Sequence, residues 1–279
     1  MEEFIMKKRN EIGFIGTGNM GEALIAGLLK AKFTTPVQII AFDMDGERLR
    51  SIQKKYGIKK ASDNHHLASQ CDSLLLCVKP QSMKEVIEGM ADALDSSKLL
   101  ISIAAGVPLY AIETYARKQL RLIRVMPNIN VLVQEGASAI APGNLATDED
   151  IRLAKAIFDC VGRSMTIDET LMDVVTGLSG SGPAYVFLMI EALTEAGVHL
   201  GMTRSQALML VTQTVKGSAK LLSESGEHPG LLREKVTSPG GTTAAGLYQL
   251  EVGGLRKVLI GAVIAAAQRS KELGERMKP

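Results

Sequence analysis

The chain has 279 residues, 46% of them hydrophobic and 22% charged, which is enough for one large or two modest domains and excludes wholesale disorder. Its 32 basic and 30 acidic residues leave a net charge of +2, which argues against a dedicated nucleic-acid-binding protein. The lack of Trp and the 4% of aromatic residues argue against base-stacking surfaces and carbohydrate clefts.

Three cysteines, Cys71, Cys77 and Cys160, are odd in number and have no Cys-x-x-Cys spacing. We therefore expect neither a disulfide framework nor a metal site, but reduced thiols in a cytoplasmic protein. The first ten residues are charged and lack the apolar region of a signal peptide. The longest apolar stretch, 258–267, is about half of what a membrane span needs, so no membrane association is expected.

Residues 1–167 alternate short apolar runs with amphipathic stretches. Strands are predicted at 11–15, 37–42, 73–78, 99–104 and 120–125, and helices at 20–30, 48–56, 83–94 and 108–118. Such alternation is typical of a parallel-rich sheet with helices on both faces, that is, of an α/β domain.

From residue 168 the β-branched runs disappear and long helical patterns take over, at 183–200, 203–223 and 253–273. The second of these opens with Thr203-x-x-Gln206, which is a capping-box signature. Residues 168–279 are therefore predicted to form a separate, all-α C-terminal domain.

A glycine-rich turn follows the first predicted strand. Gly16, Gly18 and Gly21 form a G-x-G-x-x-G pattern at the start of a predicted helix. In a βαβ unit these glycines permit a tight turn, a close approach of a pyrophosphate and close packing of the helix on the strand. The pattern favours a Rossmann dinucleotide-binding domain, with a purely structural turn as the alternative.

Asp43 ends the second predicted strand, where an acidic residue can accept a hydrogen bond from an adenosine ribose and would repel a 2′-phosphate. This favours NADH, although Arg48 and Arg50 lie nearby in the sequence and could offset the charge. The alternative is that Asp43 caps the next helix. Both interpretations stay open from the sequence alone.

Two further segments follow predicted strands, at the sheet edge where open α/β sheets bind ligands. Lys79 comes after the third strand and could bind a phosphate or be solvated. The small residues at 104–106, after the fourth, would let a flat nicotinamide ring approach the backbone. Arg124 and Asn128 follow the fifth strand with the same ambiguity.

The second half carries more specific motifs: VTGLSGSGPAY at 175–185, HP at 228–229 and VTSPGGTT at 236–243. Together with the glycine turn and the segments at 78–80 and 104–106, they closely resemble the pyrroline-5-carboxylate reductase family. This resemblance covers nearly the whole chain. It implies the reduction of 1-pyrroline-5-carboxylate to L-proline with NADPH or NADH, and a helical domain that forms a homodimer or a larger homo-oligomer.

The resemblance also implies site residues. It places the substrate on the loop that contains Ser238, Gly241, Thr242 and Thr243, with Thr243 as the catalytic residue that orients the ring nitrogen or the carboxylate. It adds Asn64 to the cofactor site. The predicted cofactor contacts are Ile15, Gly16, Thr17, Gly18, Asn19, Met20, Asp43, Asn64, Val78, Lys79, Pro80, Ala104, Ala105 and Gly106.

The loop at 236–243 is also suited to an anion on physical grounds. The N–H groups of Gly241, Thr242 and Thr243 would open a helix N-terminus, which suits an anion such as a carboxylate. The hydroxyls of Ser238 and Thr243 can add donors. The alternative is an ordinary helix–helix turn with Thr242 or Thr243 as the N-cap.

Two other functions compete. A β-hydroxyacid dehydrogenase has a similar glycine turn but needs a lysine on the first long helix of its second domain, and residues 183–200 contain none. A non-enzymatic NAD(P)-sensing module would have no use for the anion-suited loop. The apolar helices at 185–196 and 258–267 carry more apolar surface than so small a domain hides, which again favours an oligomer.

Overall fold

The computed structural model describes residues 11–277, and its N-terminal part contains one eight-stranded sheet with the order β3-β2-β1-β4-β5-β6-β7-β8. Neighbouring strands are parallel except for β6 and β7, which are antiparallel. The predicted parallel-rich sheet is therefore confirmed. The strands are β1 (Ile12–Ile15), β2 (Ile39–Phe42), β3 (Lys59–Lys60), β4 (Ser73–Leu76), β5 (Leu99–Ser102), β6 (Arg121–Pro127), β7 (Gly136–Pro142) and β8 (Gly162–Thr166).

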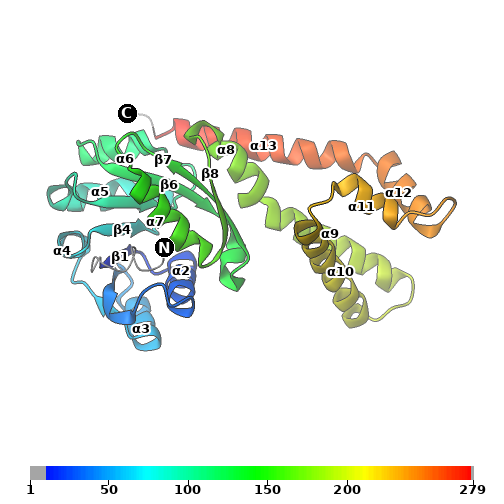
Figure 1. Cartoon of the computed structure of the whole chain (residues 1–279), viewed down its shortest axis with the longest axis horizontal. Helices are drawn as coiled ribbons and strands as arrows, with labels where there is room; N and C mark the ends of the chain where they lie inside the picture. The colour runs from blue at the N-terminus through cyan, green and yellow to red at the C-terminus, as the bar shows by residue number, and fades with distance from the viewer. Residues whose placement is uncertain (1–10, 278–279) are drawn as a thin grey trace. The chain divides into compact units, whose positions relative to one another are not determined.

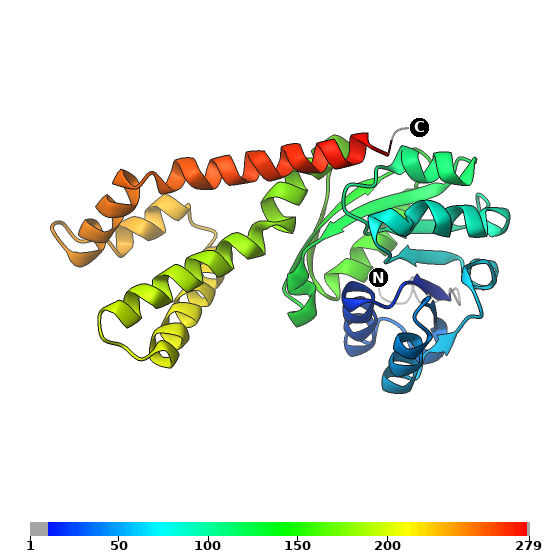
Figure 2. The same ribbon diagram turned by 180° about the vertical axis from the view of Figure 1, so that it is seen from behind.

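Helices cover both faces of this sheet (Figures 1 and 2). Side chains of α2, α3 and α7 share a buried cluster with Phe14 and Leu75, and those of α4, α5 and α6 share another with Ile15 and Leu74. Because successive strand residues point to opposite faces, strands buried on both sides are apolar throughout, which is why they are recognisable. The helices are α2 (Asn19–Lys30), α3 (Gly46–Tyr56), α4 (Asn64–Gln70), α5 (Met83–Met90), α6 (Leu109–Ala116) and α7 (Asp148–Asp159).

The sequence patterns do not predict five elements of this domain, namely β3, α4, β7, α7 and β8. β7 consists mostly of Gly, Ala and Ser, which have low strand propensity, and β8 is a polar, half-exposed strand. α7 does carry a readable signal. Thr147 and Asp150 form a capping box at its start, with each side chain accepting a hydrogen bond from the backbone N–H of the other.

The chain after β8 is all helical, as predicted. Thr203 caps α10 as its sequence signature indicates, because its hydroxyl accepts a hydrogen bond from the N–H of Gln206. No helix in residues 11–277 combines the length and apolar character that a membrane span requires. The helices are α8 (Met172–Val175), α9 (Gly182–His199), α10 (Arg204–Ser225), α11 (Pro229–Lys235), α12 (Thr242–Val252) and α13 (Leu255–Glu275).

The chain divides into two compact units. One comprises residues up to 180 and those from 265 onward, and the other comprises 181–264. The sheet ends at Thr166, and among the described residues only helices follow it. The compact units divide later, after residue 180, so α8 belongs to the first unit. The last turns of α13, from residue 265, also belong to the first unit. The division into functional domains at 1–167 and 168–279 stays a prediction.

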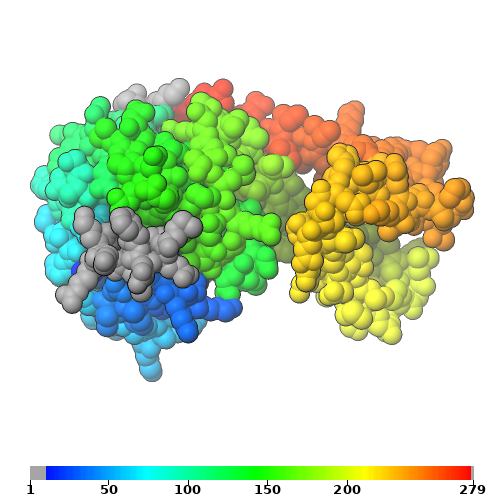
Figure 3. Space-filling view, in the orientation of Figure 1, coloured from blue at the N-terminus to red at the C-terminus, as the bar shows by residue number. Residues whose placement is uncertain are grey.

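The second unit exposes large apolar side chains. Phe187 is 59% exposed, Leu200 is 84% exposed and Ile260 is 61% exposed. Figure 3 shows the atoms of α10, α11 and α12 at the surface of this unit. A soluble monomer rarely leaves so many large apolar residues uncovered, so this surface is suited to burial against another chain.

Candidate active site

The turn between β1 and α2 contains three glycines, and the fold itself requires two of them. Gly16 has φ +94°, and a Cβ there would lie 2.7 Å from the carbonyl oxygen of Cys77. At Gly21 a Cβ would lie 2.4 Å from the carbonyl oxygen of Gly16. At Gly18 a Cβ would meet nothing within 4 Å. The first and third glycines thus close the turn, and the second keeps the space beside it open.

This open space lies at the start of α2. Gly18 is the N-cap of that helix, and it has no side chain to accept hydrogen bonds from the first turn. The N–H groups of Asn19 and Met20 begin the helix, where backbone donors and the helix dipole favour an anion. The residues present therefore fit the pyrophosphate of a dinucleotide.

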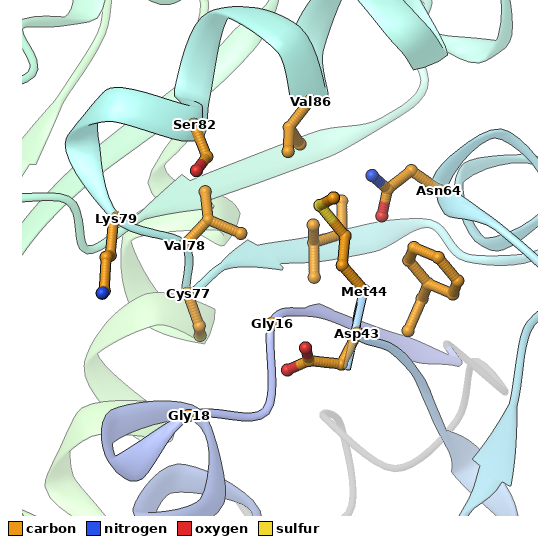
Figure 4. Close-up of a pocket in the computed structure, with 12 residues that line it drawn as sticks. Gly16, Gly18, Asp43, Met44, Asn64, Cys77, Val78, Lys79, Ser82 and Val86 are labelled. Atoms are coloured by element: carbon orange, nitrogen blue, oxygen red, sulfur yellow. The ribbon is translucent and has the colours of Figure 1, made fainter. Parts of the chain in front are cut away.

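A pocket opens next to this turn, at the carboxyl ends of β1, β2 and β4 (Figure 4). It brings together seven of the predicted cofactor residues, which are Ile15, Gly16, Gly18, Asp43, Asn64, Val78 and Lys79. Five lining residues were outside the prediction: Phe42, Met44, Cys77, Ser82 and Val86. Phe42, Met44 and Cys77 lie at or beside the ends of predicted strands, and Ser82 and Val86 lie a few residues after Lys79. Their closeness in sequence to predicted site residues was the only feature that could have indicated them. Burial raises the pKa of the Cys77 thiol, so it lines the pocket as a neutral group.

The other predicted cofactor residues do not line this pocket. Thr17 is fully buried, so its side chain faces the protein interior. Pro80 starts a short 3-10 turn after β4, and the segment at 104–106 follows β5. The roles of these residues, and of Asn19 and Met20, stay predictions.

Asp43 is bound to the glycine turn. One carboxylate oxygen accepts hydrogen bonds from the backbone N–H of Thr17 at 2.6 Å and from its hydroxyl at 2.9 Å. The other accepts from the N–H of Asp45 at 2.9 Å. The N-cap of α3 is Asp45, whose side chain accepts from two N–H groups of the first turn. The alternative that Asp43 caps this helix is therefore wrong.

Asn64 is the first residue of α4, a helix capped by Asp63. Its side-chain oxygen Oδ1 is buried and has no hydrogen-bond partner in the described structure. A buried polar atom without a partner costs free energy, so such an atom beside a pocket is well suited to accept from a ligand. A ribose hydroxyl of a dinucleotide is a donor of the right kind.

A partly buried ion pair anchors the segment that follows β5. Arg124, whose side chain is 7% exposed, lies 3.3 Å from Glu169. The same carboxylate oxygen accepts a hydrogen bond from the N–H of Leu109 at 2.8 Å, where α6 begins. Gly106, with φ +72°, precedes this anchor by three residues. Arg124 therefore has a structural partner, and Asn128 has one too, because its side chain accepts from the N–H groups of Asn130 and Ala137.

Replacing Glu169 by Ala is expected to lower the free energy of unfolding by about 2 kcal/mol. The change leaves the buried Arg124 without its counter-charge and Leu109 without its acceptor, while the 32% exposure of Glu169 keeps the cost below that of a fully buried pair. Glu169→Gln, which retains an acceptor oxygen, should lose less. Urea denaturation followed by circular dichroism measures both. An alanine variant as stable as the wild type would contradict the anchor.

The loop predicted to hold the substrate belongs to the second unit. It leads into α12, whose N-cap is Gly241 and not Thr242 or Thr243. The N–H of Gly241 donates to the carbonyl oxygen of Ser238 at 3.0 Å, so this donor is used within the loop. Gly240 has φ +66°, which explains the glycine there. Thr242 and Thr243 occupy the first two helical positions, where N–H groups have no intrahelical acceptor.

Next to this loop, Glu227 and His228 have structural partners. Both carboxylate oxygens of Glu227 accept from the Lys235 ammonium, at 2.7 and 2.6 Å. The ring nitrogen Nδ1 of His228 accepts from the N–H of Gly230 at 3.1 Å and caps α11. These contacts stabilise α11 and assign no chemical role to either residue.

Comparison with known proteins identifies the family. Residues 169–273 match the model described as pyrroline-5-carboxylate reductase dimerisation, and residues 11–106 match the model described as NADP oxidoreductase, coenzyme F420-dependent. The pyrroline-5-carboxylate reductase of Methanosarcina acetivorans is 48% identical over 269 residues, which cover 96% of this chain and 100% of that protein. The chain belongs to the pyrroline-5-carboxylate reductase family.

Solved structures of reductases of this name have the same fold. The enzyme of Coxiella burnetii superposes with a TM-score of 0.91 at 37% identity, covering 95% of this chain and 99% of that one. The enzyme of Plasmodium falciparum, solved with NADP bound, gives 0.85 at 35% identity and covers 95% and 98%. The resemblance predicted from the sequence motifs is confirmed. The match to a dimerisation domain, together with the apolar surface of the second unit, indicates a homo-oligomer.

Proposed function

We propose that this chain reduces 1-pyrroline-5-carboxylate to L-proline with NADPH or NADH, the last step of proline biosynthesis. The observation that carries this proposal is the similarity over nearly the whole chain to reductases of this name. The β-hydroxyacid dehydrogenase alternative is not supported, because α9 contains no lysine. A non-enzymatic sensing module is not supported either, since the relatives are reductases.

The cofactor is assigned to the first unit. The open space at Gly18, the N–H groups at the start of α2 and the unpartnered oxygen of Asn64 all suit a dinucleotide. When bound, the cofactor supplies the hydride. The residues of the pocket would hold and orient it.

The substrate carboxylate is assigned to the start of α12. The N–H groups of Thr242 and Thr243 begin this eleven-residue helix, and the helix dipole favours a negative charge there. The hydroxyls of Ser238 and Thr243 add donors for the carboxylate or the ring nitrogen. We assign Thr243 the orienting, catalytic role because it carries both an N–H and a hydroxyl at this position.

The reaction requires little acid–base catalysis from these residues. A protonated cyclic imine accepts hydride at its carbon and keeps the proton on its nitrogen, so the charge of the iminium is neutralised without a strong enzymic acid. Catalysis then depends mainly on position, because holding two reactants in the correct geometry removes most of the entropic cost of their encounter. The loop at 238–243 fixes one reactant by its carboxylate.

Crystals of the protein soaked with proline test this assignment. We expect ordered proline with its carboxylate at the N–H groups of Thr242 and Thr243, because α12 begins there. Pyrrolidine, which has the same ring without the carboxylate, is the matched control and should leave the loop empty. An empty loop at a saturating concentration of proline would contradict the substrate assignment.

We further propose that the oligomer is at least a homodimer formed through the apolar surface of the second unit. Sedimentation velocity should give a mass of at least twice the 29.9 kDa of one chain. A dilute and fully active monomer would contradict this proposal. A cytoplasmic location is proposed on separate grounds, because Cys71, Cys77 and Cys160 are free thiols.

A further inference from the structure

We infer that this chain favours NADH over NADPH, and that Asp43 is the residue that determines this choice. The inference rests on the proposed function and goes beyond it. It departs from the NADP that the matched N-terminal family model names and that the Plasmodium falciparum enzyme binds, and it rests on this chain's own residues. It depends on two observations. The first is a fixed negative charge where the adenosine ribose would bind, and the second is the engagement of the neighbouring Arg48 with other acceptors.

The charge of Asp43 lies at the ribose end of the pocket. Asp43 follows β2 directly and lines the pocket with Met44 and Asn64 (Figure 4). In a dinucleotide-binding fold, this is the position of the acidic residue that accepts a hydrogen bond from the ribose 2′-hydroxyl. The unpartnered oxygen of Asn64 marks the same part of the pocket as a place for a ligand donor.

The carboxylate of Asp43 is held in place. Its three hydrogen bonds come from the N–H and hydroxyl of Thr17 and from the N–H of Asp45, at 2.6, 2.9 and 2.9 Å. Thr17 is fully buried and lies within the glycine turn itself, so the charge is tied to the phosphate-binding segment. A carboxylate offers about four lone-pair positions, which leaves one for a ribose hydroxyl. It offers nothing favourable to a 2′-phosphate.

Arg48, the first cation after Asp43, is engaged with other acceptors. Arg48 donates from Nε to the carbonyl oxygen of Thr17 at 2.9 Å and forms an ion pair with Glu22. Glu22 also pairs with Lys55 at 2.8 Å. The sequence alone allowed Arg48 to offset Asp43, but the structure directs its guanidinium to these other acceptors.

Two other cations need to be considered. Arg50 lies 3.9 Å from Glu47 in an exposed pair and does not line the pocket. Among the described lining residues, Lys79 is the only cation, and Figure 4 shows it at the end of the pocket away from Asn64. At the ribose end, the described lining residues therefore present the carboxylate of Asp43 and no cation beside it. A phosphate on the ribose adds about two negative charges there, and such a juxtaposition of like charges is strongly unfavourable.

Equilibrium binding tests the inference without turnover. Isothermal titration calorimetry on the wild-type protein should give a dissociation constant about tenfold or more lower for NAD⁺ than for NADP⁺. Initial rates with 1-pyrroline-5-carboxylate should give a similar preference for NADH in kcat/KM. Asp43→Asn, which keeps an acceptor for Thr17 but removes the charge, should shift both ratios toward the phosphorylated cofactor by about tenfold.

Two further variants separate the role of Asp43 from general effects. Asp63→Asn removes one charge from the cap of α4, outside the pocket lining, and should leave the binding ratio of the two cofactors unchanged. Asp43→Glu retains the charge and should retain the preference for NADH, so it remains informative if Asp43→Asn fails to fold.

Each outcome has a distinct meaning. Equal or tighter binding of NADP⁺ by the wild type, or a ratio that Asp43→Asn leaves unchanged, overturns the inference. Binding of NAD⁺ without reduction of 1-pyrroline-5-carboxylate by either cofactor overturns the proposed function and leaves the inference on cofactor choice intact.

Discussion

Gly18→Ala is expected to weaken cofactor binding by about tenfold to a hundredfold while leaving the protein folded. The added methyl group meets nothing within 4 Å in the protein, so it enters the space in which the pyrophosphate would lie against the start of α2. The backbone at Gly18, with φ −59° and ψ −173°, is accessible to alanine. The free energy of unfolding should therefore change by less than about 1 kcal/mol.

The matched control is Gly16→Ala, in the same turn. There φ is +94° and the added Cβ would lie 2.7 Å from the carbonyl oxygen of Cys77. This variant should lose on the order of 2 kcal/mol or more of stability. Calorimetric titration with NAD⁺ and thermal unfolding measure the two effects separately. If Gly18→Ala binds cofactor as tightly as the wild type, the pyrophosphate does not lie at this turn.

Thr243→Val should lower kcat/KM for 1-pyrroline-5-carboxylate by about tenfold to a hundredfold, the effect of losing one hydrogen bond to a charged group. Valine has nearly the same shape but no hydroxyl, and position 243 lies in the first turn of α12, where the proposal places the substrate. The Kd for cofactor should not change, because Thr243 has no assigned part in cofactor binding.

Thr114→Val is the matched control for this variant. The hydroxyl of Thr114 donates to the carbonyl oxygen of Tyr110 on an exposed part of α6, so its loss should leave the steady-state kinetics unchanged. Steady-state kinetics and thermal unfolding of both variants provide the comparison. Wild-type turnover and substrate affinity in Thr243→Val would refute its catalytic role.

The elements that the sequence predicts best are those buried on both sides. β1, β4 and β5 consist of residues that are nearly all apolar because each face packs against helices. β7 is equally part of the sheet, but its small residues favour a strand only in the context of β6 and β8. Tertiary packing decides such a segment, and local propensity does not.

The candidate site, too, could be predicted from the sequence only in part. The glycine pattern predicts the turn, and the structure gives a steric reason for glycine at Gly16 and Gly21 and shows open space at Gly18. The sequence does not reveal that Thr17 faces inward to bind Asp43, because that bond joins residues 26 positions apart. Nor does it reveal that Gly241 donates its N–H to Ser238 within the loop. Such contacts depend on the three-dimensional path of the chain.

The most direct test of the account is an assay of purified protein with 1-pyrroline-5-carboxylate and each reduced nicotinamide cofactor. The near-ultraviolet absorbance of the cofactor should fall in step with the appearance of L-proline, one molecule of proline for each molecule of cofactor oxidised. If that absorbance stays constant with both cofactors while the protein is folded and oligomeric, the proposed reaction is wrong.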